Sequence, residues 1–324
     1  GAARNNTATT IEERIITGIR LGYKINKWVN LSYNFGSNST NLSRDEITQE
    51  FSRAADGLGR IIEDHYGSNE LQSTFIASVN PKLGNNFTLD FKLGNDINQR
   101  TSKRQTNTGK DFVVPKIYNL KNTVTQSFDD DSKYKRRIVG FFADATLGYT
   151  NFAFINVSAR NDHTSTLPYK NASDYYPGVS GSLGWTDALK LKNNWLDYGK
   201  IRAGWVKVGN DAPPNNGQDI FVINQNFLGQ PSTSLGSQTI DPNLTPEFTK
   251  ELEGGFDLSL FKHRVDIDFT IYRKITTNLI YAIDVPTTTR YTRFHTNLRT
   301  ISNKGLEIAL TARRVVTNNF SWEI

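Results

Sequence analysis

Residues 265–274 read VDIDFTIYRK, and this stretch decides the fold class. Apolar side chains occupy every second position, at Val265, Ile267, Phe269 and Ile271, and the positions between them are charged or polar. Alternate side chains of a strand point to opposite faces, so the stretch predicts a strand with one apolar and one polar face. The same alternation recurs at Val29, Leu31, Tyr33 and Phe35, at Phe87, Leu89, Phe91 and Leu93, at Phe141, Ala143, Ala145 and Leu147, and at Leu306, Ile308, Leu310 and Ala312.

The length of these segments favours a membrane barrel over a soluble sandwich. About twelve such strands are expected, and they run past the ~9–11 residues that cross a bilayer at a tilt, whereas strands of soluble proteins average ~5–6. Their charged face suits the wet lumen of a wide barrel. We therefore predict an all-β, transmembrane antiparallel β-barrel. Twelve strands alone would leave two unpaired edges, which hydrocarbon does not tolerate, so we expect a fragment of a larger closed barrel.

Short turns alternate with long loops along the chain. Tight turns are expected at Asn26-Lys27, Asn85-Asn86, Thr150-Asn151, Lys192-Asn193-Asn194, Lys262-His263 and Asn318-Asn319. Bacterial barrels keep periplasmic turns short and surface loops long. The extracellular segments are therefore expected near Ser37 to Gln72, Gln99 to Lys133, Asn161 to Asp174, Asp211 to Pro246 and Thr276 to Leu298.

Composition excludes several other classes. The chain has 324 residues, a net charge of +6 and no cysteine. No apolar run approaches the ~18 residues of a membrane helix. The positive charge is spread along the sequence, so no nucleic-acid partner is expected. The four histidines lack metal-ligand spacing, which predicts no metal site. Asp162, His163 and Ser165 share one loop without a nucleophile elbow, which predicts no enzyme.

One segment departs from the alternating pattern. Ser43 and Glu46 have the spacing of a capping box, and apolar residues then recur at helical spacing. We predict an amphipathic helix from Arg44 to about Asp64, whose apolar face either packs on neighbouring loops or contacts a partner. Its apolar residues are Ile47, Phe51, Ala54, Ala55, Leu58, Ile61 and Ile62.

Five segments, in this order, resemble the SusC/RagA-like TonB-dependent outer-membrane transporters. They are Arg160 to Pro168, Tyr175 to Ser180, Ile201 to Trp205 with Val208 to Asp211, Leu244 to Gly255, and Asn303 to Glu307. The resemblance implies a 22-stranded barrel in the bacterial outer membrane, closed by a plug. We expect residues 1–324 to form a barrel portion, because no plug domain, TonB box or closing strand is recognisable.

The resemblance also implies a function and partners. These are energised uptake of oligosaccharides or peptides, a SusD-like surface lipoprotein, and a TonB complex that acts through the plug; no cofactor is implied. Two alternatives stay open: a passive porin or structural barrel, and a secreted carbohydrate-binding β-protein without a lipid face.

Loops held by a rigid scaffold are the expected place for binding residues. The predicted ligand contacts are Asp162, His163, Tyr175, Tyr176, Asn210 and Asp211, although tyrosines at strand ends also serve as interface-girdle residues. The predicted lipoprotein contacts on the helix are Ile47, Phe51, Leu58 and Ile61. Gly178, Gly181 and Gly184, interleaved with Ser180 and Ser182, predict a place where another segment, such as the plug, approaches the strand closely.

Overall fold

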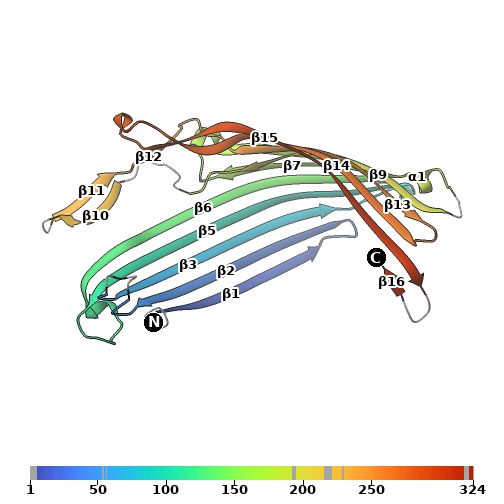
Figure 1. Ribbon diagram of the computed structural model, residues 1–324. Helices are drawn as coiled ribbons and strands as arrows, with labels where there is room; N and C mark the ends of the chain where they lie inside the picture. The colour runs from blue at the N-terminus through green and yellow to red at the C-terminus, as the bar shows by residue number, and fades with distance from the viewer. Residues whose placement is uncertain are drawn as a thin grey trace. The chain divides into compact units, whose positions relative to one another are not determined.

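The computed structural model describes residues 6–52, 55, 57–191, 195–214, 221–227, 230–316 and 321–323. Its dominant element is a 14-stranded sheet in the order β1-β2-β3-β5-β6-β7-β8-β9-β13-β14-β15-β12, with β4 on β5 and β16 on β15. A separate hairpin joins β10 and β11 (Figure 1). The all-β, antiparallel prediction is confirmed, although the short β12 runs parallel to its neighbour β15.

The strand bounds are β1 (Thr7–Lys24), β2 (Val29–Thr48), β3 (Arg60–Val79), β4 (Lys82–Leu83), β5 (Phe87–Phe112), β6 (Thr123–Tyr149), β7 (Ala153–Thr164), β8 (Ser173–Gly184), β9 (Leu196–Asn210), β10 (Phe221–Phe227), β11 (Gln230–Leu235), β12 (Gln238–Ile240), β13 (Glu247–Leu260), β14 (Val265–Asp284), β15 (Arg293–Val316) and β16 (Ser321–Glu323). Helical elements among the described residues include α1 (Trp185–Ala188) and the 3₁₀ turns Leu120–Asn122, Tyr169–Asn171 and Thr287–Thr289. No helix in the described residues is long and apolar enough to cross a membrane.

The chain divides into two compact units. The first comprises Gly1–Leu21, Tyr33–Thr74 and Asp96–Ile138, and the second comprises Gly22–Ser32, Phe75–Asn95 and Val139–Ile324. Within the first unit, Arg104 donates to both carboxylate oxygens of Asp64, at 2.9 and 2.8 Å, and Thr106 donates to the same carboxylate at 2.9 Å. This arrangement cross-links β3 and β5 through side chains.

Four of the predicted turns are confirmed, and all four belong to the second unit. Asn26-Lys27, Asn85-Asn86, Thr150-Asn151 and Lys262-His263 each lie between consecutive strands. The Lys262-His263 turn uses left-handed backbone at Phe261, Lys262 and His263, with φ of 57°, 60° and 57°. The turns at Lys192-Asn193-Asn194 and Asn318-Asn319 lie outside the described residues.

The predicted helix is wrong. Strand β2 continues to Thr48 and β3 begins at Arg60, so the ends of the predicted helix lie in two strands. The predicted residue Ala54, in the connection between these strands, lies outside the described residues. Pairing between β2 and β3 satisfies backbone groups that a helix would satisfy internally, and tertiary pairing overrides a local helical pattern.

The glycines of this connection also oppose a helix. Gly57 and Gly59 have φ of 84° and 86°, and a Cβ at Gly59 would lie 2.4 Å from the Phe112 ring. Only glycine fits there, and the chain turns back rather than coiling. The strands β2, β3, β5 and β6 extend into the long loops predicted from Ser37 to Gln72 and from Gln99 to Lys133, so these segments are largely strand.

Candidate functional site

Charged side chains gather on one face of the sheet at β9, β13 and β14. Arg202 on β9 forms ion pairs with Asp257 on β13 and, at 2.8 Å, with Asp268 on β14. The same guanidinium donates to the Thr270 hydroxyl at 2.6 Å, and the Lys200 ammonium lies 3.4 Å from Asp257. Asp257 and Asp268 are direct cross-strand partners, so the Arg202 charge offsets the repulsion between these two carboxylates.

The opposite face of the same strands is apolar and open. Ile201, Phe256, Phe269 and Ile308 form one row of cross-strand partners over β9, β13, β14 and β15. The rings of Phe256 and Phe269 stack with centroids 5.0 Å apart. Ile308 is 63% exposed and Ile201 is 49% exposed. An exposed apolar face opposite a charged face matches a wall between lipid and water, and not a soluble sandwich.

A second polar pair lies on β7 beside β6. The Arg160 guanidinium donates to Asp162 at 2.6 Å, and both side chains lie over the backbone of Gly140. A Cβ at Gly140 would lie 2.3 Å from the Asp162 carboxylate, so glycine leaves room for this ion pair. Nearby, Asn156 donates to Asp144 at 2.9 Å and to the Thr146 hydroxyl at 2.8 Å. The polar face of β6 and β7 is thus also internally paired.

Beyond these strands, three connections meet in a small buried cluster. We call it the connection cluster and define it as Thr164, Thr166, Leu167, Asn171, Asp211, Ala212, Leu244 and Asn297. The Asp211 carboxylate accepts hydrogen bonds from the Thr164 and Thr166 hydroxyls at 2.5 and 2.6 Å. The apolar centre consists of Leu167, Ala212 and Leu244, which are 8%, 2% and 0% exposed.

Asparagine side chains join the remaining backbone of the connection cluster. The Asn171 amide donates to the carbonyls of Asn243 and Leu244 at 2.9 and 3.0 Å. The Asn297 carbonyl oxygen accepts from the Thr245 N–H at 2.9 Å, and its amide donates to the Thr245 carbonyl at 3.0 Å. Polar groups in loops need such partners when they are buried, and these bonds hold the loops in one arrangement.

His295 lies beside this cluster and is 7% exposed. Its Nε2 lies 2.9 Å from the Gln238 Oε1, and the neighbouring Thr296 hydroxyl donates to Asp241 at 2.9 Å. Burial, aided by the Arg293 charge, lowers the pKa of His295 below its ordinary value of 6.5. The neutral imidazole can donate from Nε2 to Gln238.

A pH dependence follows from His295. His295 takes up a proton near pH 6.5 in the unfolded segment and only at lower pH in the folded one. The stability that the neutral imidazole contributes is therefore fully present above pH 6.5 and is lost as the pH falls through the lowered pKa. Hydrogen exchange in residues 238–244 should therefore accelerate from pH 8 to pH 5, after correction for intrinsic exchange. His295→Gln should remove this dependence. An unchanged dependence in the variant would exclude His295 as its source.

The structure does not bring all six predicted ligand residues together, although Tyr176 shares the face of Asp162 and lies within electrostatic reach of Asp162 and Asp211. Asp162 is paired with Arg160, and Asp211 is held in the connection cluster. The Asn210 amide donates to Glu247 at 3.2 Å. Cross-strand pairing of Asp162 with Asp174 and of Asn161 with Tyr175 shows that Asp162 and Tyr175 point to opposite faces. The predicted residues therefore do not form one surface.

Tyrosine and histidine rings lie at two places in this region. Tyr175 is 70% exposed, and the His163 ring meets the Tyr169 ring edge-on at 6.5 Å. Tyr176 is half-buried near the Lys207 ammonium, which lies 6.0 Å from its ring centroid and 3.0 Å from Asp174. His163 and Tyr175 keep accessible rings, whereas Tyr176 packs within the protein.

The predicted lipoprotein contacts also differ in exposure. Phe51 and Leu58 are 87% and 57% exposed, whereas Ile61 is only 3% exposed and Ile47 is half-buried. Only Phe51 and Leu58 of this set present large open apolar surfaces. No group of three or more His, Asp or Glu side chains in the described part of the chain is placed to hold a metal ion.

Sequence reasoning missed the residues that join the loops. Thr164 and Thr166 occur in a segment that had been singled out, but their hydroxyls reach Asp211 from 47 and 45 residues away. Leu244 begins another segment that had been singled out, but nothing in that segment predicted its burial, and Asn297 gave no signal, since a lone asparagine in a polar loop is common. Arg202 carried a weak signal, because it is a basic residue on the polar parity of an apolar strand.

A sheet with one charged face and one exposed apolar face, joined by ordered connections at one end, is the wall of an outer-membrane type β-barrel. The family model described as TonB dependent receptor-like, beta-barrel matches residues 2–324, and the chain belongs to this family. The barrels of this family lie in the bacterial outer membrane.

Curated relatives are similar to this chain in sequence, and a solved structure is similar to it in fold. The chain is 28% identical over 193 residues to TonB-dependent receptor P26 of Formosa agariphila, covering 58% of this chain and 19% of the relative. It is 24% identical over 206 residues to TonB-dependent receptor SusC of Bacteroides thetaiotaomicron, covering 59% and 20%. The fold matches the RagAB peptide transporter with a TM-score of 0.87 at 17% identity, covering 98% of this chain and 36% of that one. The chain spans about a fifth of these curated relatives.

Proposed function

We propose that the full protein imports oligosaccharides or peptides across the outer membrane, driven by the TonB complex. The observation that carries this proposal is the charged face at Lys200, Arg202, Asp257 and Asp268, which backs directly onto an exposed apolar face. Such a wall can line a wet passage through lipid. Membership in the TonB dependent receptor-like family supports active transport over passive diffusion.

Open edges support a larger barrel in the full protein. In the described residues, β1 pairs only with β2, and its side chains are exposed from Thr7 to Lys24. Unpaired backbone groups are not tolerated in hydrocarbon, so further strands must cover this edge in the membrane. We propose that these strands, and a plug on which the TonB complex acts, come from the rest of the protein.

Uptake measurements on the full-length protein distinguish active import from a passive pore. Cells that express it should accumulate labelled oligosaccharides or peptides, and this accumulation should stop when an uncoupler collapses the proton motive force or when TonB is deleted. A passive porin would keep equilibrating its solute under both treatments. A secreted binding protein would be recovered without detergent. Either result would overturn the import proposal.

Ligand contact is proposed for Tyr176 and Asp162, because cross-strand pairing puts both side chains on the polar face with Arg160. Aromatic faces suit sugar rings, and Tyr176 is only half-buried. The rings of Tyr175 and His163 are exposed, but they lie on the apolar face, opposite Asp162, and are a weaker basis for contact with a ligand in the lumen. Asn210 and Asp211 already bond to protein groups.

A SusD-like surface lipoprotein is the partner that we propose for the connection between β2 and β3. Phe51→Asp should lower lipoprotein co-purification by about tenfold or more, because a hot-spot aromatic contributes about 2 kcal/mol. Asp also tolerates the left-handed backbone at this position, where φ is 64°.

Phe261→Asp is the matched control for this experiment. Phe261 is also left-handed, with φ of 57°, and 52% exposed, but it lies in the short turn between β13 and β14. The control should leave co-purification intact. Equal yields from both variants would remove Phe51 from the proposed interface.

A further inference from the structure

Small residues form a trough across the apolar face of three strands. Gly181 on β8 is the cross-strand partner of Ala203 on β9, which is in turn the partner of Gly254 on β13. Parallel to this row lie the larger partners Leu183, Ile201 and Phe256 on one side, and Val179, Trp205 and Leu252 on the other. The small row is therefore a depression between two rows of larger side chains.

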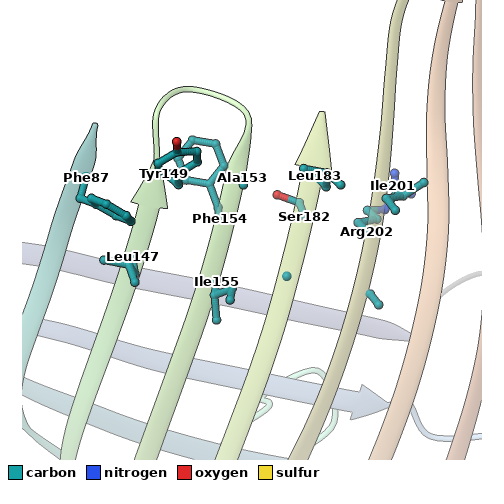
Figure 2. Close-up of a pocket in the computed structure, with 12 residues that line it drawn as sticks. Phe87, Leu147, Tyr149, Ala153, Phe154, Ile155, Ser182, Leu183, Ile201 and Arg202 are labelled. Carbon is teal, nitrogen blue, oxygen red and sulfur yellow. The ribbon is translucent and has the colours of Figure 1, made fainter. Parts of the chain in front are cut away.

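The depression opens into a hollow of about 560 Å³ towards the Thr150-Asn151 turn. Figure 2 shows Ile155, Leu183 and Ile201 around it on β7, β8 and β9, and Phe87, Leu147 and Tyr149 on β5 and β6. The Phe87 and Tyr149 rings lie 4.9 Å apart, and Phe152 adds a third ring 5.6 Å from Tyr149. Volumes of this size hold small-molecule ligands.

Packing within the sheet does not require the hollow. A Cβ at Gly181 would meet only the Phe154 carbonyl at 3.6 Å, which is ordinary contact, and Gly254 is similar, with the Arg202 carbonyl at 3.8 Å. Neither glycine has the left-handed backbone that would demand glycine. The period-three glycines do not share a face: pairing places Gly178 and Gly184 with Arg202 on the polar face and Gly181 on the apolar face. The plug cannot reach Gly181 from a lumen on the polar side.

We propose that this hollow binds an acyl chain of a phospholipid. The hollow is continuous with the apolar face that meets lipid, where Ile201, Leu252 and Ile271 are 49%, 59% and 52% exposed. Arg202 is the one charged residue among those described that lines it, and its guanidinium is engaged by Asp257, Asp268 and Thr270. The lining therefore suits a hydrocarbon chain and not a head group.

The position of the hollow selects the lipid. It lies beside the Thr150-Asn151 turn, and short turns of bacterial barrels are periplasmic. The phospholipid leaflet of the outer membrane faces that side. The inference depends on the membrane location of the sheet and not on the proposed import.

Native mass spectrometry of the full-length protein tests the lipid site. The protein is reconstituted in phosphatidylethanolamine–phosphatidylglycerol vesicles, extracted and activated until loosely held lipid is lost. The wild type should retain one phospholipid. Ala203→Leu, which fills the trough, should reduce the retained fraction at least about tenfold, and Gly181→Leu should act alike. Ala312→Leu is the matched control, because it adds the same bulk on the same face of β15, away from the hollow.

Three outcomes would overturn the lipid site. One is a wild type that retains no phospholipid, and another is an equal loss in Ala203→Leu and Ala312→Leu. The third is a wild-type dimer that Ala203→Leu dissociates, since a second copy would then fill the hollow. Unchanged electrophoretic heat-modifiability of each variant shows that the barrel is folded, so a lower retained fraction reports on binding.

Discussion

Ile308→Arg is expected to destabilise the inserted protein by about 2–4 kcal/mol, the cost of an arginine near the midplane on the lipid face of a barrel. Ile308 is 63% exposed on the apolar face and pairs with Phe269. Its side chain would have to bring a guanidinium into hydrocarbon with no partner there. Denaturant titration of the full-length protein folded into vesicles measures the difference.

Ala309→Arg is the control, because it places the same residue one position further along β15. Ala309 pairs with Asp268, so the new cation would point to the polar face, opposite a carboxylate. We expect little loss from this change. Equal losses in the two variants, or a larger loss from Ala309→Arg, would mean that the two faces have been assigned wrongly.

Asp211→Ala should loosen the connection cluster by about 2–3 kcal/mol, or roughly 30–150-fold in local opening, because hydrogen bonds to a charged group contribute about 1.5–3 kcal/mol. The carboxylate accepts from two hydroxyls, and both threonines are under 10% exposed. Hydrogen exchange of residues 164–167 and 244–245 measures the opening.

Asp211→Asn distinguishes a structural role from ligand binding. The amide keeps one oxygen acceptor, so protection should fall much less than with alanine. If alanine leaves exchange unchanged but abolishes ligand uptake, Asp211 binds ligand as the sequence alone suggested, and the role assigned to it in the connection cluster is wrong.

The strands could be predicted from the sequence because the pattern and the environment coincide. In residues 265–271, the apolar side chains lie on the exposed apolar face and the polar side chains lie on the charged face. The alternation of apolar and polar residues therefore runs through the strand without interruption. The turn at Lys262-His263 was equally visible, because polar residues separate two alternating segments.

The helix prediction failed where local pattern and tertiary pairing disagree. Ile47, Ile61 and Ile62 have helical spacing, but they lie in β2 and β3, and these strands pair with each other. The contacts around the candidate site could not be predicted for a different reason. Asp211 is bound by Thr164 and Thr166 through contacts that join residues at least 45 positions apart, and no local pattern encodes such a contact. His163 and Tyr175 were recognised as residue types, but their orientation depends on register.

Cysteine scanning of residues 306–311 tests the two-faced wall most directly, because residues 1–324 contain no cysteine. Any cysteine elsewhere in the full-length protein is first replaced by serine. Single cysteines are introduced at each position of the full-length protein in vesicles and exposed to a membrane-impermeant maleimide. The structure predicts labelling at Glu307, Ala309 and Thr311, and protection at Leu306, Ile308 and Leu310. Uniform labelling, or labelling of the second set alone, would contradict a sheet with lipid on its apolar face and water on its charged face.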